Sequence, residues 1–105
     1  MKFSLVTLFF LVGLAGCAHL TPLEEAAQHY RLHGDFTALN NTVELMPVGT
    51  GTATVRRLLG EPIDMGFDFR YLVDSLGPTG CSVGAVFHID GAGLVDDKWT
   101  GDICE

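Results

Sequence analysis

The sequence predicts an α+β domain in which N-terminal helices pack on a three-stranded antiparallel sheet. Up to about residue 60, apolar residues recur at helical spacing. From residue 67 onward they alternate with polar residues, which is typical of half-buried strands. Two turn sequences, at residues 77–80 and 90–93, divide this second half into three strands.

Three helices are expected, over residues 23–33, 36–46 and 52–59. Each lies between residues that begin or end helices, namely Pro22 and Gly34, Asp35 and Pro47, and Thr52 and Gly60 with Pro62. For Gly60 we expect the left-handed C-cap conformation. The apolar stripes that should face the sheet are Leu23, Ala26, Ala27 and Tyr30, then Phe36, Leu39, Val43 and Met46, then Val55, Leu58 and Leu59.

The strands are expected to bury one face each. The apolar sets are Phe67, Phe69, Tyr71 and Val73, then Cys81, Val83, Ala85, Phe87 and Ile89, then Val95, Trp99 and Ile103. Trp99 is therefore expected in the core. A three-residue loop in the second hairpin would pair Phe87 with Asp97 and Ala85 with Trp99. This register leaves Cys104 one residue out of step with Cys81.

The N-terminal segment has the organisation of a secretion signal. Lys2 precedes an apolar run over residues 3–12, which is too short to span a bilayer. Leu14-Ala15-Gly16-Cys17 then resembles the lipobox of bacterial lipoproteins, in which the cysteine thiol accepts diacylglycerol. We expect residues 1–16 to be a signal peptide, residues 17–22 a tether lipidated at Cys17, and residues 23–105 the folded domain. By resemblance to the enteric sorting rule, Ala18 in place of aspartate favours the periplasmic face of the outer membrane over the inner membrane.

The acidic charge excludes some classes of partner. Loss of Lys2 with the leader takes the formal charge from −7 to −8. Because nucleic acid would be repelled by such a surface, no nucleic-acid partner is expected. Arg56-Arg57 is the one adjacent basic pair, which is too little for a polyanion site. Membrane attachment must then come from the lipid on Cys17.

The cysteine count points to a single disulfide. With Cys17 lipidated, Cys81 and Cys104 remain as an even pair in an oxidising compartment, so we expect them to be bridged. The alternative is two buried free thiols. No C-x-x-C sequence is present, and a thiol-redox enzyme is therefore not expected.

Residues 49–62 read G-T-G-T-A-T-V-R-R-L-L-G-E-P. This segment resembles the SmpA/OmlA, or BamE-like, outer-membrane lipoproteins, with matches at Gly49, Val55, Leu59, Gly60 and Pro62. Phe69-Arg70-Tyr71 and residues 86–91 resemble the first two strands of that family. The resemblance covers roughly residues 45–99. It implies a helix-plus-sheet fold and a role in the cell envelope. The matched residues are of kinds that build the fold, so they support architecture more than activity.

The candidate binding surface is the sheet face opposite the predicted core. His88 lies on this face by alternation, and we expect Arg70, Leu72 and Val86 beside it. If the helices leave the face uncovered, it is the best candidate for binding a partner. The alternative is an ordinary solvent-facing surface. His88 has no serine or free cysteine partner that we can identify, so no enzyme is expected.

Two other groups of polar residues are candidates for chemistry. His29 and His33 are four residues apart on a predicted helix and, with His19 or Glu25, could bind a metal. The alternative is a solvated helix face. Asp96-Asp97, with Asp102 and Glu105, could serve acid–base work or calcium, or could protect an exposed sheet edge. No metal and no cofactor are expected.

Three functional hypotheses follow. The first is a non-enzymatic outer-membrane lipoprotein that binds a protein partner of the cell envelope through its sheet, as a scaffold or assembly module. The second is an enzyme-inhibitor or small-ligand module, because a similar helix-plus-sheet module occurs in proteinaceous β-lactamase inhibitors. The third is a periplasmic metal or hydrolytic site built from His29, His33 and the acidic residues.

Overall fold

The computed structural model describes residues 20–104, which form three helices followed by a four-stranded sheet. The elements are α2 (Pro22–His33), α3 (Phe36–Leu45), α4 (Thr52–Leu59), β1 (Ile63–Asp64), β2 (Asp68–Leu76), β3 (Ser82–Ile89) and β4 (Val95–Ile103). The strand order is β1-β2-β3-β4, and all neighbours are antiparallel. The α+β class and the three helices are confirmed. The expectation of three strands was wrong, because the sheet has a fourth strand, the short edge strand β1.

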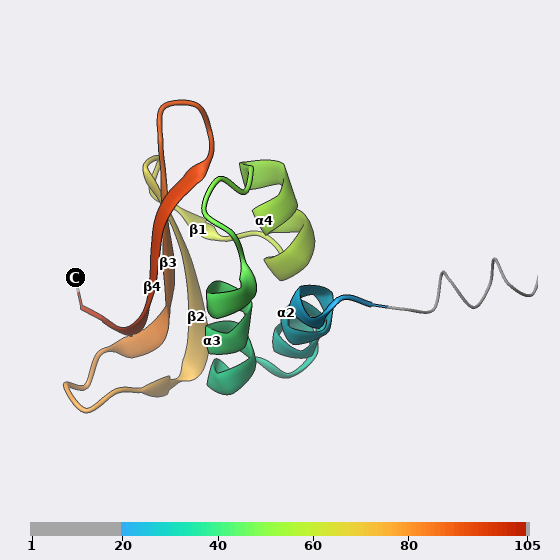
Figure 1. The fold of residues 1–105 in the computed structure, drawn as a ribbon. Coiled ribbons are helices and arrows are strands. Elements are labelled where there is room, and N and C mark those ends of the chain that lie inside the picture. Colours follow the sequence, from blue (N-terminus) through green and yellow to red (C-terminus); the bar gives the residue numbers. More distant parts are fainter. Residues whose placement is uncertain (1–19, 105) are drawn as a thin grey trace, which may run out of the picture.

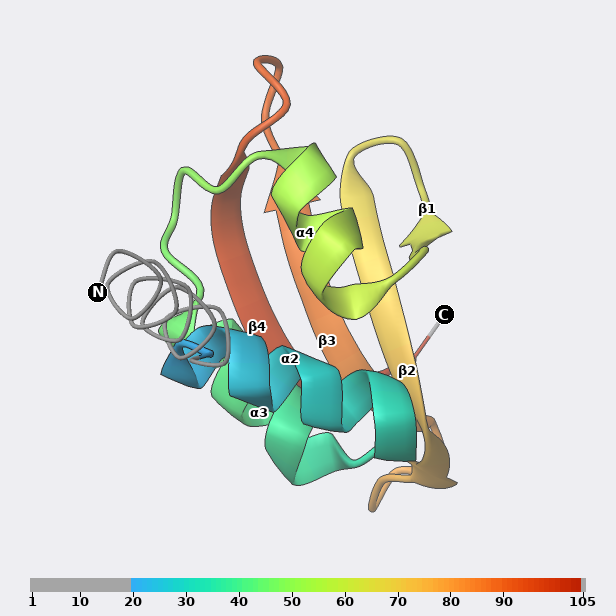
Figure 2. The ribbon, with the colours of Figure 1, turned by 90° about the vertical axis from the view of Figure 1, so that its right-hand side faces the viewer.

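The molecule has two layers, with the helices on one side of the sheet (Figure 1). In Figure 2 the helix layer faces the viewer, with α4 over the upper part of the sheet and α2 and α3 over its lower part. We call the sheet face toward the helices the inner face and the opposite one the outer face. The largest fully buried side chains between the layers include Phe87, Leu39, Met46, Val55 and Val95. No helix of residues 20–104 lies over the outer face (Figure 1).

Local capping explains why two of the helices begin and end where the sequence predicts. The Thr21 hydroxyl accepts a hydrogen bond from the Glu24 amide at 3.1 Å, and the Glu24 carboxylate accepts one from the Thr21 amide at 3.2 Å, which completes a capping box. Gly34 ends α2 in the left-handed conformation. Asp35 then caps α3 through the Ala38 amide at 3.2 Å.

The two ends of α4 depend on contacts from elsewhere in the chain. Gly51 provides no side-chain cap, and the Thr52 amide instead donates to the Gly93 carbonyl, in the β3–β4 turn, at 3.2 Å. Gly60 is not left-handed as expected. Its φ of 85° and ψ of −168° lie in a region that essentially only glycine can occupy. The buried Tyr71 hydroxyl donates to the Gly60 carbonyl at 2.8 Å, which joins the end of α4 to β2.

A β-bulge sets the register of β4. His88 pairs with Asp97 and Ile89 pairs with Val95, so Asp96 is an extra residue in the strand. The expected pairing of Phe87 with Asp97 and of Ala85 with Trp99 was therefore wrong, since Phe87 pairs with Lys98. Because a shift of one residue moves every side chain to the opposite face, Trp99 lies on the outer face and is 45% exposed.

The same shift turns Lys98 toward the helices. Its ammonium donates to the carbonyls of Val43 and, at 2.5 Å, of Met46. The last carbonyls of a helix have no partner within the helix, and a cation there is favoured by the helix dipole. Lys98 therefore fixes the end of α3 against β4.

Phe67 is another predicted core residue that the structure places at the surface. It precedes β2 in the turn from β1, and it is 57% exposed. The turn is closed by a hydrogen bond of 2.8 Å from the Met65 amide to the Asp68 carbonyl. The alternating pattern thus holds for Phe69, Tyr71 and Val73, and it fails at the residue before the strand begins.

Candidate binding face of the sheet

The pairing register defines the outer face as rows of residues that run across the strands. The central row is Ile63, Arg70, Val86 and Trp99, with one residue from each strand. The row above it is Asp68, His88 and Asp97, and the row below it is Leu72, Gly84 and Gly101. The four candidate residues Arg70, Leu72, Val86 and His88 therefore share this uncovered face.

An apolar groove of about 420 Å³ lies on this face. Its lining consists of Ile63, Met65, Arg70, Leu72, Ser82 and Ile103, together with the two bridged cysteines. The row of Leu72 carries no side chain at its other two positions, because both are glycine. At Gly84 a Cβ atom would lie 2.0 Å from the Tyr71 carbonyl oxygen, so the close approach of the strands requires glycine there. The backbone itself thus leaves this part of the face bare.

The groove is flanked by partly exposed apolar side chains. Ile63, Met65 and Leu72 are between 37% and 48% exposed, and Trp99 stands at the β4 end of the central row. Val86, between Arg70 and Trp99 in that row, is buried although no helix covers it. Apolar residues gathered on one uncovered face are typical of a contact surface.

The upper end of the outer face is acidic. Asp68 and Asp97 flank His88 in one row, and Asp96 lies next to them at the bulge. The His88 Nδ1 atom lies 2.5 Å from Asp96 Oδ1, and this hydrogen bond raises the pKa of His88 above its ordinary value. The nearby charges of Asp96, Asp68 and Asp97 act in the same direction, and desolvation opposes them. His88 is therefore a histidine that holds its proton at higher pH than an isolated one.

This geometry predicts a pH-dependent stability. A pKa that is raised on folding stabilises the protein fully below the unfolded value of about 6.5, and this contribution is lost as the pH rises through the folded value. We expect the midpoint of thermal unfolding to fall between pH 6 and pH 9 by more in the wild type than in a His88→Gln variant. NMR titration of the imidazole should give a pKa that returns toward 6.5 in Asp96→Asn. Equal pH profiles for the wild type and His88→Gln would contradict this assignment.

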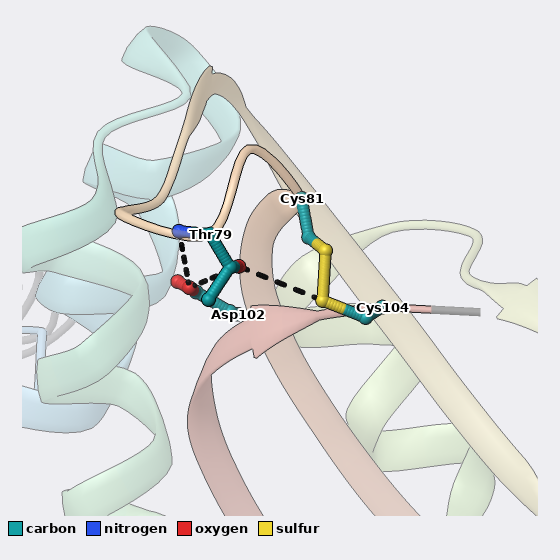
Figure 3. Close-up of a disulfide and its surroundings, with 4 residues drawn as sticks. All are labelled: Thr79, Cys81, Asp102 and Cys104. Atoms are coloured by element: carbon teal, nitrogen blue, oxygen red, sulfur yellow. Dashed lines mark hydrogen bonds between the residues drawn. A yellow bond between two sulfur atoms is a disulfide. The ribbon is translucent and has the colours of Figure 1, made fainter.

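A disulfide joins Cys81 to Cys104 (Figure 3), and both cysteines line the groove. The Cα atoms are 5.2 Å apart, and the bridge ties the start of β3 to the end of β4. Thr79 lies beside it. The Thr79 hydroxyl donates a hydrogen bond to the Asp102 carboxylate at 2.7 Å, and it lies 3.6 Å from the Cys104 sulfur. The pairing expected from the cysteine count is therefore present, and the thiols are not free to act as nucleophiles or metal ligands.

The two histidines of α2 that were candidates for metal binding are separate from this face. The rings of His29 and His33 lie 4.6 Å apart on α2, and His29 Nε2 is 3.7 Å from Asp35. Among residues 20–104 no three histidine, cysteine, aspartate or glutamate side chains gather closely enough to hold a metal ion. The expected signal peptide, Cys17, His19 and Glu105 lie outside the described residues.

Sequence reasoning missed four large apolar side chains of the face, namely Ile63, Met65, Trp99 and Ile103. The first two lie on and next to β1, whose two residues are too few to show alternation. Trp99 and Ile103 were assigned to the wrong face because the bulge was not foreseen. One indication was available, since the expected hairpin left Cys104 one residue out of step with Cys81. An extra residue in β4 removes that mismatch.

The fold is an α+β sandwich of three helices on a four-stranded antiparallel sheet with one face uncovered in its described part. No protein-family model, curated protein or solved structure was found to match this chain. Within residues 20–104, no helix has both the length and the apolar character needed to cross a membrane.

Proposed function

We propose that the protein is a BamE-like lipoprotein, anchored through Cys17 at the periplasmic face of the outer membrane, that acts without catalysis by binding a protein of the cell envelope. The binding surface is the outer face of the sheet, with Arg70, Leu72, Val86 and His88 joined by Trp99. The observation that carries the proposal is the apolar groove on a sheet face that the described helices leave uncovered.

The position of α2 supports this assignment. α2, which begins at Pro22, belongs to the helix layer, on the side of the sheet away from the outer face (Figure 1). A tether of residues 17–22 spans at most about 20 Å when fully extended. A chain anchored so close to the membrane would present its helices toward the lipid and its outer face toward the periplasm. The disulfide is consistent with such an oxidising compartment.

Site-specific crosslinking tests the proposal. A photoreactive amino acid at Leu72, introduced into the full chain in living cells, should crosslink to an envelope protein. The matched control is the same residue at Leu32, an exposed leucine on α2. Leu72→Asp should reduce recovery of the crosslinked partner from a Trp99 photoreactive site by at least about ten-fold, because a carboxylate would be buried in an apolar contact. Leu32→Asp should leave that recovery unchanged.

The outcomes separate the hypotheses. Recovery of outer-membrane assembly proteins supports the proposal, whereas recovery of one soluble enzyme supports an inhibitor on the same fold. Equal crosslinking from Leu72 and Leu32, or none from either, contradicts a role for the outer face.

A further inference from the structure

We infer that the outer face takes an extended peptide segment in which a lysine or arginine lies about four residues from the apolar side chains. This inference rests on the proposed function and specifies the chemistry of the partner. It follows from the arrangement of the apolar groove and the acidic end of the face along the same strands.

The apolar part of the segment is determined by the groove. Ile63, Leu72 and Ile103 line a hollow of about 420 Å³, which is room for one or two aliphatic or aromatic side chains. The glycine pair of β3 and β4, Gly84 and Gly101, leaves the backbone bare beside Leu72. An extended chain can therefore approach the sheet closely here, and its alternate side chains can point down into the groove.

The basic part is determined by the carboxylates. Asp68, Asp96 and Asp97 all lie at the upper end of the face. Asp68 lies 3.9 Å from Arg70, and Asp96 is bonded to His88, so both already have a partner of opposite or potential positive charge. Asp97 is exposed, and within residues 20–104 it forms no ion pair. A cation on the partner would therefore form an ion pair with the Asp97 carboxylate.

The spacing follows from strand geometry. Gly101 is in the same row as Leu72, which lines the groove. Asp97 and Gly101 are four residues apart on β4, which corresponds to about 13 Å along the strand. A bound extended peptide has nearly the same rise per residue. Its basic side chain should therefore lie about four residues from the apolar side chain that fills the groove.

Trp99 allows a direct test. It is the single tryptophan of the chain and lies on the outer face between the two regions, so its fluorescence reports occupancy of this face. The probe is a nine-residue peptide with capped ends, leucine at its second position, phenylalanine at its fourth, lysine at its eighth and serine elsewhere. It is titrated into the mature lipidated protein in detergent at pH 7.5. Two comparison peptides carry glutamate at the eighth position, or lysine moved to the fifth.

We expect the first peptide to shift the Trp99 emission and to bind about five-fold tighter than the glutamate peptide at low salt. This preference should shrink in 1 M salt, where surface charges are screened. Asp97→Asn should weaken the preference, whereas Glu25→Gln, which removes an exposed carboxylate from α2, should keep it.

Equal affinity for the lysine and glutamate peptides would overturn the inference, as would unchanged Trp99 emission with all three. Equal affinity for both lysine spacings would overturn the four-residue separation. The proposed function is tested independently, because crosslinking from Leu72 does not depend on the charge of the partner.

Discussion

Replacing Phe87 with alanine is expected to lower the free energy of unfolding by about 4 kcal/mol, from the loss of transfer free energy and the cavity that remains. Phe87 is fully buried at the centre of the inner face. Its ring packs edge-on against Tyr71, with the ring centroids 5.9 Å apart. Since small domains have about 5–15 kcal/mol of stability in total, much of it would be lost.

The same substitution at Phe67 is the matched control. Phe67 is 57% exposed in the turn before β2, so Phe67→Ala removes little buried surface and should cost less than about 1 kcal/mol. Urea unfolding followed by circular dichroism measures both variants on one scale. Similar losses for the two variants would show that the alternation extends to Phe67 and that the turn is wrongly placed.

These two phenylalanines illustrate what the sequence can and cannot predict. Alternation identified the inner face of β2 and β3, because those strands are long enough for burial to repeat. It failed at Phe67, where a hydrogen bond between Met65 and Asp68 turns the chain before the strand begins. The helices were predicted well, because proline, glycine and capping side chains act within a few residues of each helix end.

The residues of the candidate face likewise fall into those that the sequence predicts and those that it does not. Arg70, Leu72, Val86 and His88 follow from alternation within single strands. Trp99 does not, because its side depends on the bulge at Asp96, which exists only where β4 pairs with β3. Nothing local to residues 95–99 marks this extra residue, and it decides which side chains of β4 face the helices. Lys98 meets the end of α3 for that reason.

The bulge also brings the cysteines together. With Asp96 as the extra residue, Ser82 pairs with Ile103. Cys81 directly precedes Ser82 and Cys104 directly follows Ile103, so the two cysteines are neighbours at this end of the sheet. The disulfide and the outward position of Trp99 are therefore two consequences of one insertion. The groove also depends on this pairing of the strands, since both cysteines contribute to its lining.

Removing the disulfide should accordingly cost stability. A Cys81→Ser, Cys104→Ser double variant is expected to lose about 3 kcal/mol, because the bridge closes a segment of 23 residues and restricts the unfolded chain. For a domain of this size the midpoint of thermal unfolding should fall by about 15 °C. Calorimetry of the wild type with and without a thiol reductant should give the same difference, and the double variant should not respond to reductant.

The reductant comparison separates the bridge from the serine substitutions themselves. Mass spectrometry of the wild-type protein under non-reducing conditions should show Cys81 and Cys104 joined, with neither as a free thiol. Free thiols at both Cys81 and Cys104, or an unfolding midpoint that reductant leaves unchanged, would contradict a disulfide between β3 and β4. Because Thr79 and Asp102 hold the loop beside the bridge, the double variant should still fold, with the greatest loss of amide protection at the ends of β3 and β4. The lower wall of the groove would loosen there, whereas the row of Trp99 would stay paired.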